Sequence, residues 1–164
     1  MESLKSIIDR HISASGFKEC YQRCNEPVEI DEFYRHDYAD VGGTVMTSAF
    51  RGSLQDVTES IVTAVEETKF DLYVEPRSYV DSIKECPLSD FSWLLRAMAG
   101  FSDRIFPEDD PLETEPPKLE EYLRAEGVRM FVSEYDFHCI SDGIIALLRE
   151  STEEIVVLMI YSMD

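Results

Sequence analysis

The sequence predicts an α+β fold: a single domain in which a mostly antiparallel sheet packs against three or more helices. The strongest evidence is the run at 155–161, the most apolar segment of the chain, whose β-branched residues favour a strand. A second apolar run at 144–148 is joined to it by the polar segment 149–154, which is typical of a hairpin. Apolar residues at helical spacing predict helices at 4–14, 54–67 and 90–99.

A strand in the region 130–140 would complete a three-stranded C-terminal meander. A helix that crosses a membrane needs about twenty apolar residues, so the shorter run at 155–161 belongs in a protein core. A chain of 164 residues is long enough to bury such a core without staples, and we expect one domain over residues 1–164.

The connectivity of the central part of the sheet stays open. A strand at 44–50, the helix at 54–67 and a strand at 70–74 would be the minimum for a βαβ crossover. Antiparallel pairing of the two strands is equally compatible with the pattern, so a mixed α/β fold is the alternative to α+β.

Two of the predicted helices begin with good capping residues. Ser3 precedes the helix at 4–14, and Ser53 with Asp56 matches a capping box at the start of the helix at 54–67. The apolar stripe predicted for this second helix consists of Leu54, Val57, Ile61, Ala64 and Val65.

Prolines divide the next part of the chain. Residues 78–85 are predicted to form a short helix that ends before Pro87. Leu88 and Ser89 then resemble a staple and cap for the helix at 90–99, which carries Phe91 and Leu94 on its apolar side and Trp93 beside them.

The segment 105–117 differs in composition from the rest of the chain. It contains four prolines and five acidic residues and no basic residue, which predicts an exposed acidic loop without regular structure. A short helix at 118–126 follows, and Gly127 is a natural residue to end it.

The charge balance is strongly acidic. Thirty-four acidic residues against fifteen basic ones give a formal net charge of −19, which disfavours nucleic acid and anionic membranes and favours basic partners. The N-terminal residues lack the pattern of a secretory signal, so the four cysteines are expected as reduced thiols in a cytoplasmic protein.

The titratable clusters provide little evidence of chemistry. His36, Asp37 and Asp40 could form a general-base or divalent-ion site, but the same residues suit a solvated turn. Cys20 and Cys24 form one loose pair, whereas a structural zinc site needs two pairs of ligands. We therefore predict no metal or other cofactor.

The acidic loop and the start of the helix after it form the predicted partner-binding surface, unless they are only a solvated loop. Its residues are Glu108, Asp109, Asp110, Glu113, Glu115, Glu120 and Glu121. The leading hypothesis is a non-catalytic protein that neutralises or regulates a basic protein partner, such as an immunity or antitoxin-type inhibitor of a toxin or nuclease. The alternatives are a small enzyme with a site near His36, Asp37 and Asp40, and a homodimeric adaptor subunit with its interface near Trp93.

Overall fold

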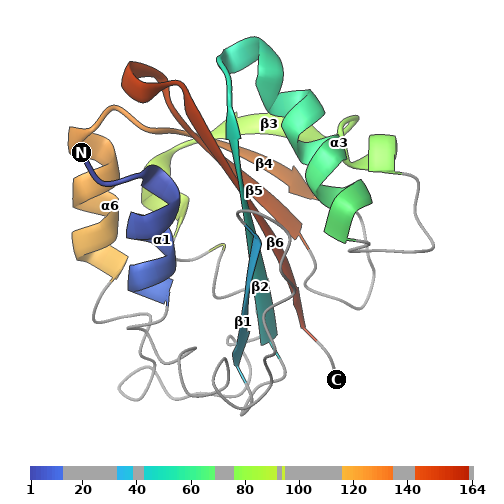
Figure 1. Cartoon of the computed structure of the whole chain (residues 1–164), viewed down its shortest axis with the longest axis horizontal. Helices are drawn as coiled ribbons and strands as arrows, with labels where there is room; N and C mark the ends of the chain where they lie inside the picture. The colour runs from blue at the N-terminus through green and yellow to red at the C-terminus, as the bar shows by residue number, and fades with distance from the viewer. Residues whose placement is uncertain are drawn as a thin grey trace.

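In the part of the chain that the structure describes, six strands form an antiparallel sheet through the centre of the molecule, in the order β1-β2-β6-β5-β4-β3 (Figure 1). The computed structural model describes residues 1–12, 33–38, 43–68, 76–91, 94, 116–134 and 143–162. The strands are β1 (Phe33–Tyr38), β2 (Gly43–Arg51), β3 (Ile83–Cys86), β4 (Arg129–Glu134), β5 (Gly143–Arg149) and β6 (Glu154–Ser162).

The predicted C-terminal meander is confirmed. Strands β4, β5 and β6 pair in sequence order with antiparallel register, and the second edge of β6 pairs with β2. The predicted α+β class is confirmed, since every pairing among the described strands is antiparallel. The predicted strand at 70–74, and the part of the predicted strand beyond residue 134, lie outside the described residues.

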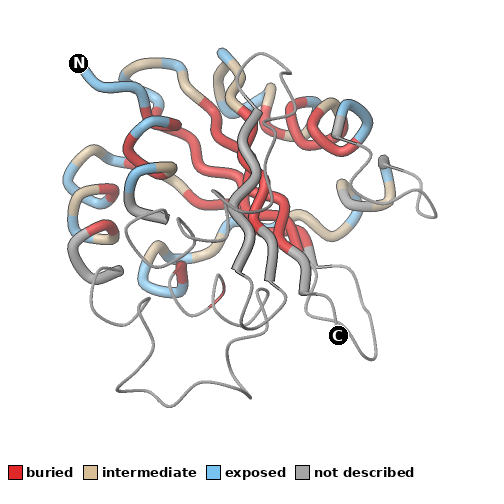
Figure 2. The backbone as a smooth tube through the Cα atoms, turned by 60° about the horizontal axis from the view of Figure 1, so that its bottom comes forward, coloured by how far each residue is buried: buried red, intermediate tan, exposed pale blue. Residues whose placement is uncertain are grey.

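Helices cover both faces of the sheet. Helices α1 (Leu4–Ile12) and α6 (Pro116–Ala125) lie side by side on one face, and α3 (Val57–Thr68) lies on the other (Figure 1). Alternate residues of β6 belong to two hydrophobic clusters, one beneath α1 and α6 and one beneath α3. Residues 155–160 are therefore buried without interruption (Figure 2), which explains why this strand is apolar on both sides.

Helix α1 begins as predicted. The backbone N–H of Ser6 donates a hydrogen bond to Ser3 Oγ at 3.2 Å, so Ser3 caps the first turn. Leu4, Ile7 and Ile8 are buried against the sheet. The predicted residues 13 and 14 lie outside the described residues.

The start of α3 confirms the capping box and corrects one core residue. The backbone N–H of Ser53 donates to Asp56 Oδ2 at 2.8 Å, and the 3₁₀ turn η2 (Leu54–Asp56) leads into α3. Leu54 is 45% exposed, although its helical spacing predicted burial. The reason is that Leu54 lies in the tighter 3₁₀ turn, whose side chains do not continue the inward stripe of the α-helix.

The prediction of a helix at 78–85 is wrong. A 3₁₀ turn at Pro76–Tyr79 (η3) is followed by strand β3, which pairs with β4 from Ile83↔Ser133 to Cys86↔Met130. The free edge of β4 supplies backbone partners for these residues, and this tertiary pairing outweighs a weak local helix pattern. Lys84 and Glu85 are exposed, as is common in an edge strand.

The helix predicted at 90–99 is described in part. A 3₁₀ turn at Leu88–Asp90 (η4) leads into helical backbone at Phe91, with Pro87 rather than Ser89 in the cap position. Phe91 and Leu94 are buried in the cluster beneath α1 and α6. Trp93 lies outside the described residues.

Helix α6 begins earlier than predicted. Pro116 and Pro117 are its first residues, although the prolines of this segment had predicted irregular structure. Proline is tolerated there because the first-turn N–H groups have no partner within a helix. Gly127 ends the helix with a φ of 67°, and Val128 N–H donates to Leu123 O at 2.9 Å. The rest of the predicted loop, residues 105–115, lies outside the described residues.

Candidate functional site

Helix α6 displays the described part of the predicted acidic surface. Leu119 and Leu123 are buried in the core, Glu121 is exposed and Glu120 is half-buried. The other five predicted residues, Glu108, Asp109, Asp110, Glu113 and Glu115, lie outside the described residues. The structure therefore places two carboxylates of this surface on a helix that is anchored in the core.

Several exposed arginines are offset by carboxylates. Arg10 pairs with Glu2 at 2.6 Å, and Arg77 pairs with Glu59 at 3.1 Å. Arg129 contacts two carboxylates, Glu85 at 2.7 Å and Glu150 at 2.9 Å. Each of these guanidinium groups is offset by at least one carboxylate, and the net charge of −19 gives the field around the molecule a negative sign.

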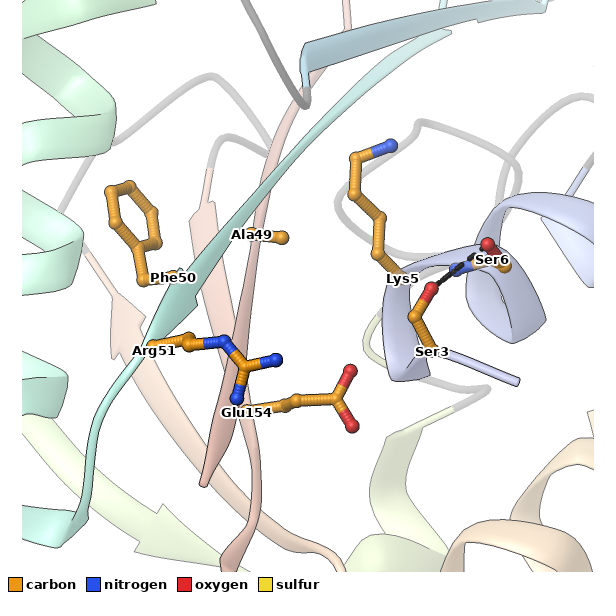
Figure 3. Close-up of a pocket in the computed structure, with 7 residues that line it drawn as sticks. All are labelled: Ser3, Lys5, Ser6, Ala49, Phe50, Arg51 and Glu154. Carbon is orange, nitrogen blue, oxygen red and sulfur yellow. Dashed lines mark hydrogen bonds between the residues drawn. The ribbon is translucent and has the colours of Figure 1, made fainter. Parts of the chain in front are cut away.

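A groove of about 340 Å³ opens between α1 and the adjacent ends of β2 and β6 (Figure 3). Arg51 of β2 and Glu154 of β6 are register partners, and their side chains enter the groove from the sheet side. Ser3, just before α1, and Ser6, in its first turn, face the groove. The lining residues are Ser3, Lys5, Ser6, Ala49, Phe50, Arg51 and Glu154.

A buried ion pair lies at one end of this groove. The Arg149 side chain is 1% exposed and its Nη2 bonds to Glu154 Oε1. Arg149 also donates from Nε to Thr152 Oγ1 at 2.8 Å and from Nη2 to the Glu2 carbonyl at 3.0 Å. The guanidinium is therefore held by the hairpin that carries it and by the residues just before α1.

Glu154 also caps helix α1. The Leu4 N–H, one of the first-turn donors with no partner within the helix, donates to Glu154 Oε2 at 2.9 Å. A carboxylate at this position interacts favourably with the helix dipole. The helix N-terminus thus has its anion from the protein itself, and the groove is not an open anion site.

The protonation of Glu154 follows from these contacts. Burial alone would raise the pKa of its carboxyl, but hydrogen bonds from Thr152, Arg149 and the Leu4 N–H, together with the charge of Arg149, outweigh burial and lower the pKa. Glu154 therefore stays ionised to lower pH than an ordinary glutamate.

Lys5, on helix α1, also forms an ion pair. Lys5 Nζ lies 2.5 Å from Asp9 Oδ2, and Asp9 Oδ1 accepts a hydrogen bond from Thr47 Oγ1 of β2 at 2.7 Å. This chain of contacts joins α1 to β2. The polar side chains around the groove hold the helix on the sheet, which is a structural role.

The residues of the enzyme alternative occupy an outer strand. His36 and Asp37 belong to β1, where they pair with Val45 and Thr44 of β2. The sequence had suggested a turn at this point, but residues 36–38 form part of strand β1. Asp40 lies outside the described residues.

The described residues contain no group of three or more His, Cys, Asp or Glu side chains that could hold a metal ion. Cys86 is not part of a disulfide, and Cys20, Cys24 and Cys139 lie outside the described residues. None of the helices in the described ranges is long and apolar enough to cross a membrane.

Sequence reasoning missed the contacts of Arg149 and Glu154, which it assigned to a polar connection. A signal was present, since opposite charges directly flank the two apolar runs and such residues pair across a hairpin. The structure shows this register, Arg149↔Glu154.

Comparison with known proteins gives one distant likeness. No protein-family model matches the chain, and no curated protein matches it. The crystal structure of citrus MAF1 is similar with a TM-score of 0.42 and 9% sequence identity, over 90% of this chain and 98% of that chain.

Proposed function

We propose that this chain is a non-catalytic binding protein that recognises a basic protein through an acidic surface and neutralises or regulates it. The specific form we propose is an immunity or antitoxin-type inhibitor of a toxin, such as a nuclease. The observation that carries the proposal is the position of α6, whose Glu121 is exposed and whose Glu120 is half-buried, and which continues the acid-rich segment before it.

The anchoring of α6 favours this role. Leu119 and Leu123 fix the helix in the core, so Glu120 and Glu121 are held on a rigid element. Carboxylates held in this way lose less conformational entropy when a partner binds. The net charge of −19 adds long-range attraction for a basic partner and repels nucleic acid.

The test is capture of partners from the native source with three forms of the protein. The first is the wild type, and the second carries Gln or Asn at the seven acidic positions from Glu108 to Glu121. The third is Glu66→Gln with Glu67→Gln, a control that neutralises an exposed pair of acids on α3. We expect the wild type and the control to retain the same basic protein at 1:1 stoichiometry, and the seven-site variant to lose it.

Salt provides the second criterion. Attraction between exposed charges is screened over about 10 Å at 0.1 M salt, so the association rate of the captured protein should fall steeply as salt is raised. Equal capture by the wild type and the seven-site variant, or association that does not depend on salt, would show that the acidic surface is not the binding surface.

A further inference from the structure

Two turns meet at the end of the sheet that is uppermost in Figure 1. A second groove is lined by residues of both turns. One is η2, which precedes α3, and the other is η7 (Glu150–Thr152), which joins β5 to β6. The Gly52 N–H donates to the Glu153 carbonyl at 2.8 Å and ties the turns together. The groove has a volume of about 470 Å³ and is lined by Ser53, Leu54, Gln55, Glu150 and Glu153.

Leu54 provides an apolar surface in this groove. Its side chain is 45% exposed, and among the described residues Met1 and Leu54 are the large apolar side chains that are exposed. Covering such a side chain is favourable by roughly 25 cal/mol for each Å² removed from water. The capping hydrogen bond from Ser53 N–H to Asp56 Oδ2 fixes the turn that presents it.

Glu150 and Glu153, from the turn between β5 and β6, add carboxylates to the lining of the groove. Glu150 pairs with Arg129, but Arg129 also pairs with Glu85, so one guanidinium offsets two carboxylates. The Glu153 side chain is exposed and forms no hydrogen bond or ion pair within the described part of the chain. The groove therefore keeps an excess of negative charge.

The backbone holds Glu153 in a defined position. Its φ of 52° is left-handed, a conformation that costs an ordinary side chain roughly 1–2 kcal/mol. The conformation is stabilised by the bond from Glu153 N–H to the Glu150 carbonyl at 3.2 Å and by the bond from Gly52 N–H. The backbone of Glu153, from which the carboxylate side chain extends, is thus tied to Gly52, next to the turn that carries Leu54.

We propose that this groove receives an arginine or lysine side chain of the basic partner protein. The aliphatic stem of that side chain packs on Leu54, and its cation pairs with Glu153. Long basic side chains commonly bury their methylene groups on apolar surface while the charge stays at its edge. The inference rests on the proposed function and adds to it a second contact, away from α6.

The test uses defined peptides and does not depend on finding the partner. The probe is acetyl-Arg-Leu-Arg-amide, titrated into the ¹⁵N-labelled protein and followed by backbone amide shifts, with acetyl-Gln-Leu-Gln-amide as the uncharged comparison. We expect saturable shifts confined to amides 52–56 and 150–154. Glu153→Gln should weaken binding about two- to five-fold, as loss of one exposed ion pair does. Leu54→Ser should weaken it by a similar factor, and Glu66→Gln should leave it unchanged.

Two results would overturn the inference: shifts that do not saturate, and saturable shifts that fall elsewhere or are insensitive to Glu153→Gln and Leu54→Ser. The same two variants, applied to the captured partner, separate this inference from the proposed function. Partner binding that is lost in the seven-site variant but unchanged in Glu153→Gln and Leu54→Ser leaves the proposed function standing and removes the groove from the interface. Failure to capture any basic partner removes the proposed function, while the peptide titration still decides whether the groove binds a basic side chain.

Discussion

Replacement of Glu154 by alanine tests the polar contacts that hold α1 on the C-terminal hairpin. The side chain of Arg149 is 1% exposed and that of Glu154 is 19% exposed, so the variant leaves a buried guanidinium without its counter-ion. It also removes the carboxylate that accepts the Leu4 N–H at the start of α1. Both losses weaken the attachment of α1 to the C-terminal hairpin.

The magnitude follows from these two contacts. Removing one partner of a buried ion pair costs about 3–5 kcal/mol, and the partial exposure of Glu154 favours the lower end of that range. Loss of a helix-capping acceptor adds about 1 kcal/mol. We therefore expect a loss of about 4 kcal/mol in the free energy of unfolding, which for a chain of this length corresponds to a fall of roughly 10 °C in Tm.

Urea unfolding followed by circular dichroism at pH 7 measures this loss. The matched control is Glu59→Ala, which breaks the Arg77–Glu59 pair, whose side chains are 68% and 62% exposed, and should cost less than about 1 kcal/mol. The double variant Arg149→Met with Glu154→Leu replaces the pair by apolar groups and should recover most of the stability. If Glu154→Ala costs no more than Glu59→Ala, the ion pair does not hold the helix and the reasoning fails.

Three further predictions concern single residues. The pKa of Glu154 is lowered in the folded chain, so its contribution to stability is complete above the ordinary value of 4.5 and is lost as the pH falls through the lowered pKa. In urea titrations, the difference in unfolding free energy between wild type and Glu154→Gln should therefore shrink over that pH range. Gly127→Ala should cost about 1 kcal/mol, since φ is +67° and no atom lies within 4 Å of the added methyl group; a packing cost well above that would be inconsistent with the structure. His36→Ala should leave capture of the basic partner unchanged, whereas loss of a measurable catalytic turnover in this variant alone would favour the enzyme alternative.

The central part of the fold was predictable from the sequence because its signals are local. The apolar runs at 144–148 and 155–161 carry β-branched residues and are separated by a short polar turn, so the hairpin needs no distant information. Caps at Ser3 and Ser53 act on backbone groups within a few residues, and both were predicted correctly.

Features that depend on distant partners were not predictable in this way. Residues 83–86 form a strand because the edge of β4 lies beside them, and their own pattern carries no strong strand signal. The role of Glu154 depends on Leu4, which lies 150 residues away in the sequence. Of the predicted binding surface, the described residues Glu120 and Glu121 lie on α6, and their role as partner contacts stays a prediction.

The central position of β6 has a consequence for folding. Strand β2 lies in the first third of the sequence, but one of its two edges pairs with β6, near the end of the sequence. Helix α1 likewise needs β6 for the carboxylate of Glu154, which accepts the Leu4 N–H, and for part of the surface that it covers. Contacts of such long sequence separation are slow to form because loop closure must precede them. During synthesis, the apolar faces of β2 and α1 lack this partner until β6 has been made, and exposed apolar surface of this kind favours aggregation during that interval.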